Sequence, residues 1–446
     1  MKKADIVIVG GSAAGPVAGI TARRHYKDAS ILLIRKEGKV MVPCGIPYIF
    51  GTIGSPDKNV IPDTLLSNNG IELMVDEVTA VDRAARTLTT AGGETIGYEK
   101  LILAVGSQPV MPPIPGMELR NVFSVRKDAN YLRELQQVLG NVKDIIIIGG
   151  GFIGAEMADE CKRMGDVNVT IVELLPHCLL LALDEEFCVL AENKLAERGV
   201  KVITENGVRA ILGNGKVDSV ELQSGEKLKA DVVILGIGAM PNTELARKMD
   251  LKIGEQRGIW VDEYMRTSDE NIFAVGDCAE KFSFFTHRPS GLRLASIATI
   301  EARIAGANVF ELKRKNQGAV GVFATAFGNF AVAAAGLTEK AARDAEFDVV
   351  ISEAAAPDKH PGSMPDAGEL KVKLIFDKTT EKLIGGEIAG SRTTGEVANI
   401  IAFAIQKAMT ADEVATFQMG THPALTASPI AYQFVDAAEQ AVVKLR

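Results

Sequence analysis

The chain has few of the residues on which many classes of site depend. Its 446 residues include five cysteines, five histidines and a single tryptophan. The cysteine count is odd and the spacing irregular, which excludes a regular disulfide scaffold and favours a reducing, cytoplasmic compartment. No Cys-x-x-Cys pair and no cluster of cysteine and histidine indicates a metal site. We therefore expect a protein without disulfides and without a metal.

Positive charge and long apolar runs are also lacking. Lysine and arginine total 49 against 57 acidic residues, so the net charge is −8 and no basic excess suggests a nucleic-acid or anionic membrane partner. No apolar run approaches the roughly 20 residues of a membrane span. The N-terminal MKKADIVIVGG enters a strand at once and lacks the anatomy of a signal peptide. These features predict a chain that binds neither nucleic acid nor membrane.

Two segments of the chain repeat one pattern. The apolar runs at 4–9 and 144–148 each lead into a glycine-rich turn and then into small residues at helical spacing. Each is followed by a further apolar strand, at 30–34 and at 168–173. A continuous β-branched run before a glycine turn is typical of a buried parallel strand that feeds a helix. The sequence therefore predicts two βαβ units.

The two units also end alike, which indicates two related domains. A strand followed by Gly-x-x-Pro occurs at 101–109 and again at 232–242, and the proline-rich 111–116 forms a natural hinge between them. From about Gly318 the pattern changes to Ala-rich strand candidates, then to an alternating run at 370–376, and then to helical patterns from Thr394. We predict an α/β protein with two Rossmann-like dinucleotide-binding domains, the second inserted in the first, and a C-terminal α+β domain. The predicted boundaries are 1–112 with 244–317, 113–243, and 318–446.

The second glycine turn has the full dinucleotide fingerprint. Gly149, Gly151 and Gly154 allow a tight turn, the approach of a pyrophosphate, and close packing of helix on strand. Glu173 follows at the end of the next strand, where an acid accepts a hydrogen bond from a ribose 2′-hydroxyl. This arrangement favours NADH over NADPH. The alternative is a glycine-rich turn in an unrelated α/β domain.

The first glycine turn departs from the fingerprint in two ways. Ser12 replaces the second glycine between Gly10 and Gly15, although serine is small enough for close approach. The expected acid at the strand end falls near Ile34, which is not acidic. Glu37 or the backbone of Lys36 are the candidates to replace it.

A stiff segment carries the most informative cysteine. Cys44 lies in VMVPCGIPY between two prolines, a glycine and a tyrosine. Taken in order, the turn GGSAAG, the segment PCGIPY, the second turn GGGFIGAE and the late TSDENIFAVGDCA resemble the FAD-dependent pyridine nucleotide–disulfide oxidoreductases. The likeness covers essentially the whole chain. It points to the single-cysteine branch, which contains coenzyme A-disulfide reductases, NADH oxidases and peroxidases, and NAD(P)H-dependent persulfide or polysulfide reductases.

The resemblance implies the cofactors and the assembly. It assigns FAD to the first domain, NADH to the second with NADPH as the alternative, and a homodimer to the C-terminal domain, with active sites at the dimer interface. The aspartate of the late motif, Asp277, would bond the ribityl chain of the flavin. The expected FAD residues are Gly10, Ser12, Ala13, Ala14, Gly15, Lys36, Pro43, Val78, Gly106, Asp277 and Ala298. The expected NAD(P)H residues are Gly149, Gly151, Phe152, Ile153, Gly154, Glu173 and Gly238.

The resemblance also implies that Cys44 reacts alone. Relatives with two cysteines carry the second one five residues later, where this chain has Ile49. Cys44 would therefore cycle as a mixed disulfide, a persulfide or a sulfenic acid, and it must react as the thiolate. A helix beginning after Pro47, or charge transfer to the flavin, would stabilise that thiolate, and Tyr48 would pack behind the sulfur. The alternative for Cys44 is a small buried hydrophobe, which we expect for Cys161, Cys178, Cys188 and Cys278.

One histidine is a candidate acid. His422 lies in GTHPALT, where related disulfide reductases bring a His-Pro pair across the dimer interface. An imidazole titrating near neutrality suits the protonation of a leaving thiolate or sulfide. The alternative is a helix-capping or interface histidine. His360, in a loop-like stretch, is expected at the surface.

The acceptor is left open among related substrates. Coenzyme A-disulfide reductases usually carry serine four residues before the cysteine and asparagine just before it, where this chain has Val40 and Pro43. The loop at 360–365 also lacks their tyrosines. We therefore favour a polysulfide or persulfide over coenzyme A disulfide, with coenzyme A as an optional ligand. An NADH oxidase or peroxidase that cycles through a sulfenic acid is the alternative. A flavoprotein that transfers electrons to a protein partner, or senses redox state, is a third hypothesis.

Overall fold

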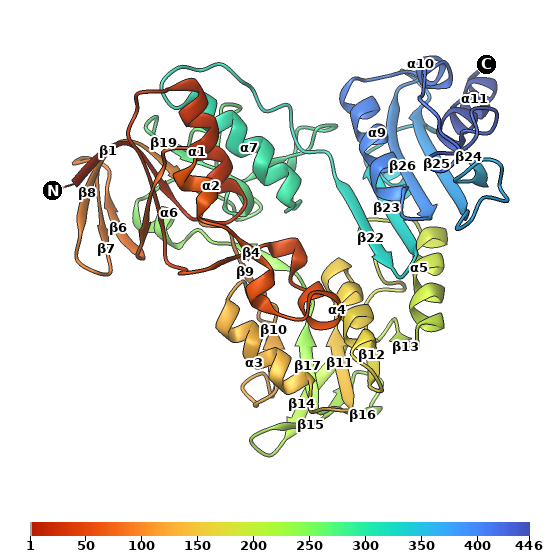
Figure 1. The fold of residues 1–446 in the computed structure, drawn as a ribbon, viewed down its shortest axis with the longest axis horizontal. Coiled ribbons are helices and arrows are strands. Elements are labelled where there is room, and N and C mark those ends of the chain that lie inside the picture. Colours follow the sequence, from red (N-terminus) through yellow and green to blue (C-terminus); the bar gives the residue numbers. More distant parts are fainter. Residues whose placement is uncertain (1) are drawn as a thin grey trace. The chain divides into compact units, whose positions relative to one another are not determined.

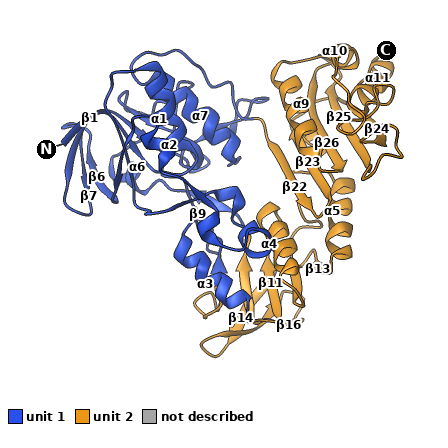
Figure 2. Cartoon of the chain, viewed as in Figure 1, with its two compact units in different colours: residues 1–113, 123–141, 237–319 blue, residues 114–122, 142–236, 320–446 orange. Residues whose placement is uncertain are grey.

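The computed structural model describes residues 2–446, which divide into two compact units. Unit 1 contains residues 1–113, 123–141 and 237–319 (Figure 2). Unit 2 contains residues 114–122, 142–236 and 320–446. The short strand β10 (Val122–Ser124) straddles the division.

Unit 1 is built on a parallel sheet that carries the first glycine turn. Its strands run in the order β5 (Glu72–Val75), β2 (Ile31–Arg35), β1 (Lys2–Val9) and β8 (Thr95–Leu103), and β19 (Ile272–Ala274) also pairs with β8. β7 (Thr87–Thr90) and β6 (Val78–Asp82) extend the edge in antiparallel fashion. The apolar runs of β1 and β2 are buried along almost their whole length, as expected for parallel strands covered on both faces.

Two long helices pack side by side next to this sheet, α1 (Ala14–His25) and α7 (Ala295–Asn308) (Figure 1). Gly306 allows their close contact, because a Cβ there would lie 2.4 Å from the carbonyl oxygen of Ala18. The remaining helices of unit 1 are α2 (Thr64–Ser67), α3 (Ala129–Leu139) and α6 (Glu244–Lys248). Its short strand pairs are β3 (Val40–Met41) with β4 (Val60–Ile61), β9 (Ser107–Pro109) with β18 (Ala239–Pro241), and β20 (Lys281–Phe282) with β21 (Pro289–Ser290).

Unit 2 contains the second parallel sheet, which carries the second glycine turn in the same way. β17 (Val232–Leu235), β11 (Asp144–Ile148), β12 (Asn168–Val172) and β13 (Val200–Ile203) lie in that order, with α4 (Phe152–Arg163) and α5 (Glu185–Glu197) packed against them. A small antiparallel sheet follows, formed by β14 (Val208–Gly213), β15 (Val217–Leu222) and β16 (Lys227–Lys229).

The C-terminal part of unit 2 is an antiparallel sheet with helices. Its order is β22 (Val322–Phe327), β23 (Phe330–Gly336), β26 (Leu383–Gly390), β25 (Glu369–Asp377) and β24 (Val349–Pro357). α9 (Thr394–Gln406) packs on β23 and β26, and α11 (Gln433–Leu445) packs on β24 and β25 (Figure 1). The shorter α8 (Glu339–Asp344) and α10 (Ala411–Ala415) complete this part.

These elements confirm the predicted fold class, with two glycine-turn parallel sheets and a C-terminal α+β part. The predicted boundaries of the three domains stay a prediction. Within residues 2–446, no helix is both long enough and apolar enough to cross a bilayer.

Candidate redox and nucleotide sites

The second glycine turn has the geometry of a phosphate-binding loop. The amide of Gly149 donates to the carbonyl of Val172 at 2.9 Å, which ties the turn to the end of β12. A Cβ on Gly154 would lie 1.9 Å from the carbonyl oxygen of Gly149, so only glycine lets α4 start so close to the strand. A Cβ on Gly151, by contrast, would meet open space. That space lies at the N-terminus of α4, whose first amides have no helical partner.

Glu173 is fixed against this turn. Its two carboxylate oxygens accept from the amides of Gly150 at 2.5 Å and Leu175 at 2.7 Å. The carboxylate is buried, and its remaining lone pairs suit a ribose diol while its charge opposes a 2′-phosphate. Phe152 and Ile153 are half-buried at the start of α4, where Phe152 stacks on Phe323 at 5.3 Å between ring centres. Gly238, also expected for NAD(P)H, lies in unit 1 with φ 91° and open space beside it.

The first glycine turn repeats this geometry. The amide of Gly10 donates to the carbonyl of Ile34 at 2.8 Å, and a Cβ on Gly15 would lie 1.9 Å from the carbonyl oxygen of Gly10. Ser12 is half-buried and Ala13 caps α1. Serine in place of the second glycine therefore leaves the turn intact.

The strand end beside the first turn carries a base. The carbonyl of Ile34 plays the part that Val172 plays in the second turn, so Arg35 is the equivalent of Glu173. Arg35 is buried, whereas Lys36 is exposed and pairs with Glu77 at 3.9 Å. The expected replacements for the missing strand-end acid were Glu37 and the backbone of Lys36, and Arg35 was not among them.

The turn that contains Asp277 lies beside the start of α1. A Cβ on Gly276, which has φ 75°, would lie 3.1 Å from the Cβ of Ala14 and 3.6 Å from that of Ala298. Three of the expected FAD positions, on α1, on α7 and on the turn itself, are thus brought together. The Asp277 carboxylate accepts from the Ser107 hydroxyl at 2.7 Å and pairs with Lys127 at 3.5 Å.

A buried ion pair holds this turn in place. The Glu301 carboxylate accepts from the amide of Gly276 at 2.8 Å and from the Lys281 ammonium at 2.9 Å. Lys281 also donates to the carbonyl of Gly276 at 2.5 Å. Burial raises the pKa of Glu301, and the neighbouring Lys281 opposes that rise. Sequence reasoning missed this pair, because Lys281 lies on β20 and Glu301 lies in the middle of α7, 20 residues later.

Taken together, these features fit a dinucleotide such as FAD. Gly106 has φ 68° with open space beside it, Pro43 opens the cysteine turn, and Val78 is half-buried on β6. The roles of the expected FAD residues stay predictions.

Cys44 lies in an exposed turn that is tightly held. Residues Pro43–Gly45 form a single 3₁₀ turn just after β3, and Asn59 secures it. The Asn59 backbone accepts from the Val42 amide at 2.9 Å, and its side-chain amide donates to the Val42 carbonyl at 3.0 Å. Ile49 is fully buried and begins a five-residue π-helix that ends at Ile53.

The other four cysteines have a different environment. Cys161, Cys178, Cys188 and Cys278 are all buried. Burial raises the pKa of the Cys161 and Cys188 thiols to about 12 and that of Cys278 to about 11, and it also raises the pKa of Cys178. A buried thiol with such a pKa is not a thiolate near neutral pH. The prediction that these four are packing residues agrees with their burial.

His422 lies in an exposed segment with a defined ring orientation. Its Nδ1 accepts from the amide of Ala424 at 3.2 Å, which leaves Nε2 to carry the proton of the neutral ring. His360 is tied to the same segment: its amide donates to the Pro423 carbonyl at 3.1 Å, and its Nδ1 lies 3.1 Å from the Thr426 carbonyl oxygen. His360 is thus half-buried and anchors the segment, rather than lying freely at the surface as expected.

A further acid lies one turn into α4. Burial raises the pKa of Glu156 to about 7, although the Thr325 hydroxyl donates to it at 3.0 Å. Sequence reasoning did not single out Glu156. Its place two residues beyond Gly154, the third fingerprint glycine, was the available signal.

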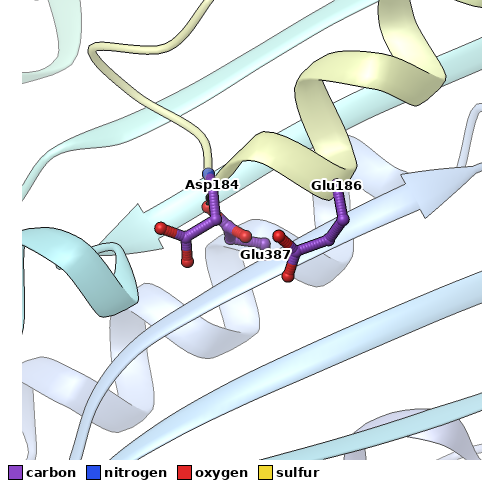
Figure 3. Close-up of side chains that lie close together, drawn as sticks. All are labelled: Asp184, Glu186 and Glu387. Atoms are coloured by element: carbon purple, nitrogen blue, oxygen red, sulfur yellow. Dashed lines mark hydrogen bonds between the residues drawn. The ribbon is translucent and has the colours of Figure 1, made fainter.

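A carboxylate cluster lies elsewhere in unit 2. Oxygens of Asp184, Glu186 and Glu387 lie within 4.8 Å of one another (Figure 3). The Lys373 ammonium sits among them, 2.9 Å from Asp184 and 2.5 Å from Glu186. Burial alone would lower the pKa of Lys373, but its hydrogen bonds to these two acids outweigh that effect and raise it. Lysine therefore supplies the cation that this cluster requires.

Comparison with known proteins agrees with this architecture. Residues 4–302 match the family model of the pyridine nucleotide-disulphide oxidoreductases, and residues 322–430 match the dimerisation domain of the same family. Members of the family typically bind FAD and NAD(P)H, and the second match implies a homodimer.

Individual relatives cover nearly the whole chain. An NADH oxidase of Methanocaldococcus jannaschii is 31% identical over 98% of this chain and 99% of its own length. An NAD(P)H coenzyme A polysulfide/persulfide reductase of Pyrococcus horikoshii is 33% identical over 88% of each chain. The solved structure of an NAD-dependent persulfide reductase from A. fulgidus superimposes with a TM-score of 0.92 at 31% identity, covering 99% of this chain and 83% of the other.

Proposed function

Because the chain belongs to the pyridine nucleotide-disulphide oxidoreductase family, and is therefore an NAD(P)H-dependent flavoprotein oxidoreductase, we propose that it reduces a small sulfur species through Cys44. The substrate class is a persulfide or polysulfide, and the products are a thiol and sulfide. The redox residue is a single cysteine.

One observation carries this proposal: Cys44 is exposed, whereas the other four cysteines are buried with raised pKa values. Attack on sulfur requires an accessible thiolate. The position that holds a second cysteine in two-cysteine relatives is the buried Ile49, so the turn offers no local resolving thiol. In this proposal Cys44 forms its disulfide with a sulfur atom of the substrate and not with a second cysteine.

The reaction balances in two steps. The Cys44 thiolate attacks a persulfide RSSH, which forms the mixed disulfide between Cys44 and R and releases HS⁻. When bound, FAD would accept a hydride from NAD(P)H and pass the electron pair to this disulfide. Two electrons and one proton then restore the Cys44 thiolate and release RSH. The sum is RSSH + NADH → RSH + HS⁻ + NAD⁺.

We assign the proton of the second step to His422. The acid is the protonated ring, the imidazolium, because a neutral imidazole does not release its N–H proton near neutral pH. The His422 side chain is exposed on a segment that belongs to the dimerisation domain match. NADH is the preferred reductant in this proposal, because Glu173 presents a fixed negative charge at the end of β12.

Two of the relatives support sulfur as the acceptor. The reductases of P. horikoshii and A. fulgidus are named for persulfide, and the former is also named for coenzyme A. Val40 and Pro43 stand where coenzyme A-disulfide reductases usually carry serine and asparagine. We therefore place coenzyme A as an optional carrier of the persulfide sulfur and not as an obligatory one.

Anaerobic stopped-flow of the NADH-reduced protein tests the proposal. The acceptors are inorganic polysulfide, coenzyme A persulfide, coenzyme A disulfide and hydrogen peroxide, and the flavin absorbance is followed. Wild-type flavin should be reoxidised fastest by polysulfide or persulfide, and Cys44→Ser should slow this step by at least about a hundredfold because serine is no comparable nucleophile.

Cys188→Ala, which removes a buried thiol on α5, is the matched control and should reoxidise like the wild type. Equal rates for wild type and Cys44→Ser with every acceptor would refute the proposal.

A second candidate is an NADH oxidase or peroxidase, which the M. jannaschii relative favours. In that case Cys44 cycles through a sulfenic acid, and peroxide or oxygen is the acceptor. The same stopped-flow series separates the two. Fast reoxidation by peroxide, lost in Cys44→Ser and absent with polysulfide, would assign the chain to this second activity.

A further inference from the structure

The two glycine turns allow an internal comparison, residue by residue. Gly10 bonds to the carbonyl of Ile34, and Gly149 bonds to that of Val172, so the residues that follow these carbonyls occupy equivalent positions. In the second turn that residue is Glu173. In the first turn it is Arg35. A group that accepts hydrogen bonds from a ribose is thus replaced by one that only donates.

The stem of Arg35 fills the space beside the first turn. A Cβ on Gly11 would lie 2.4 Å from the Cδ atom of Arg35, so the arginine chain lies directly against the glycine. Only 2% of the Arg35 side chain is exposed. The aliphatic part of the Arg35 side chain therefore covers the strand end at Gly11. The guanidinium lies farther from the turn, against Asp63.

The guanidinium is held by a bidentate carboxylate. Nη1 and Nη2 of Arg35 lie 2.7 Å and 3.0 Å from the two carboxylate oxygens of Asp63, while Nε and Nη2 donate to the carbonyls of Glu37 at 2.8 Å and Gly38 at 3.1 Å. Such a fork fixes both partners in one geometry. A buried arginine needs this partner, because an unpaired buried charge is costly.

Asp63 keeps an open side. It stands just before α2, and 53% of its side chain is exposed although its partner is buried. Oδ2 accepts a hydrogen bond from Arg35, Oδ1 forms an ion pair with it, and each oxygen has a further lone pair. Arg35 thus anchors a carboxylate from a segment 28 residues away to the strand end that lacks its own acid.

We propose that Asp63 is the ribose-binding carboxylate of the first nucleotide site, held in position by Arg35. Its free lone pairs accept hydrogen bonds from the adenosine ribose hydroxyls of FAD, as Glu173 does for NADH in the second site. Arg35 is a positioning residue and touches the ribose only through Asp63. This inference rests on the binding of FAD by the first domain, which belongs to the proposed function.

The test measures the binding of two flavins to the full-length protein after removal of its flavin. FAD contains the adenosine ribose and FMN does not, so the affinity for FMN reports the flavin half of the site alone. Dissociation constants come from the quenching of flavin fluorescence, in wild type and in Asp63→Asn. In Asp63→Asn, loss of a hydrogen bond to a charged group should raise the dissociation constant of FAD at least about tenfold. The dissociation constant of FMN should equal that of the wild type.

Asp57 provides the matched control. It is similarly exposed in a neighbouring 3₁₀ turn, where it pairs with Lys39 at 2.8 Å and Arg133 at 3.1 Å. Asp57→Asn should leave both affinities unchanged.

Unchanged FAD binding in Asp63→Asn would overturn the inference and leave the proposed function standing. Equal loss of FAD and FMN would also overturn it, since Asp63 would then support the fold and not the ribose. A wild-type protein that binds no FAD would overturn the inference and the proposed function together.

Discussion

The two candidate nucleotide sites differ in the side chain at the end of the strand beside each glycine turn. The place of Glu173 was predictable, because fingerprint spacing and strand length together locate an acid at the strand end, and its contact with a ribose stays a prediction. Arg35 occupies the equivalent position, where the usual rule associates an arginine with a 2′-phosphate, a group that FAD does not contain. Its partner Asp63 lies on a different element, and bidentate pairing between distant residues appears only in the folded structure. The pair of Lys281 with Glu301 was missed for the same reason, and so was the contact of Glu156 with Thr325, 169 residues away.

Among single substitutions, Glu173→Gln should weaken the binding of NADH. Both carboxylate oxygens now accept from turn amides, and an amide side chain has only one oxygen to offer. The KM for NADH should rise about tenfold, and the preference for NADH over NADPH should fall as the negative charge is lost. Steady-state kinetics with each nucleotide measure both effects. Glu197→Gln on the exposed end of α5 should match the wild type, and an unchanged KM in Glu173→Gln would exclude the predicted contact.

Among the elements, periodic runs were the most predictable part of the fold. The strand predicted at 144–148 is β11 (Asp144–Ile148), and the alternating run at 370–376 lies within β25 (Glu369–Asp377). The helical pattern predicted from Thr394 begins α9 at that residue. The 3₁₀ turn at Pro43–Gly45 was not predicted, because prolines and a glycine specify stiffness without specifying which turn forms. Its shape is set by Asn59, which follows it by many residues.

Gly45→Ala should disturb this turn specifically. A Cβ there would lie 2.1 Å from Oδ1 of Asn59, whose amide is already committed to the Val42 carbonyl. Overpacking of this kind costs about 1–3 kcal/mol, and relief by movement of the turn would displace Cys44. We expect the melting temperature to fall and turnover with polysulfide to drop at least about tenfold.

Gly38→Ala is the control for this substitution, because a Cβ at that exposed position meets nothing within 4 Å. A Gly45→Ala protein with wild-type turnover and a lowered melting temperature would show that the position of the turn matters for stability only.

For the whole molecule, the sequence repeats predicted the order of the domains. They did not predict the contacts between elements that are far apart in the sequence. The cluster in Figure 3 is an example, since Asp184 and Glu186 belong to the start of α5 and Glu387 to β26. The Asp184 amide donates to Glu387 at 2.7 Å, and Lys373 of β25 bonds to Asp184 and Glu186. The sequence separations exceed 180 residues, so no local pattern could reveal the cluster.

This cluster makes the stability of the protein depend on pH. Burial raises the pKa of Glu387 from 4.5 to about 8, with the charge of Asp184 as a further cause. The folded state therefore keeps a proton that the unfolded state releases above about pH 4.5. We therefore expect stability to fall as the pH rises from about 4.5 to 8, by on the order of 5 kcal/mol in all.

Glu387→Gln should remove this dependence, because glutamine keeps the shape and the acceptor for the Asp184 amide but has no proton to lose. Relative to wild type, the variant should gain free energy of unfolding steadily between pH 5 and pH 8.5, as measured by urea denaturation at fixed protein concentration. Glu353→Gln, which alters an exposed partner of Lys371 on the same sheet, should show no such trend. A constant difference between Glu387→Gln and wild type across that range would mean that Glu387 is ionised in the folded protein, with Lys373 balancing its charge as well as those of Asp184 and Glu186.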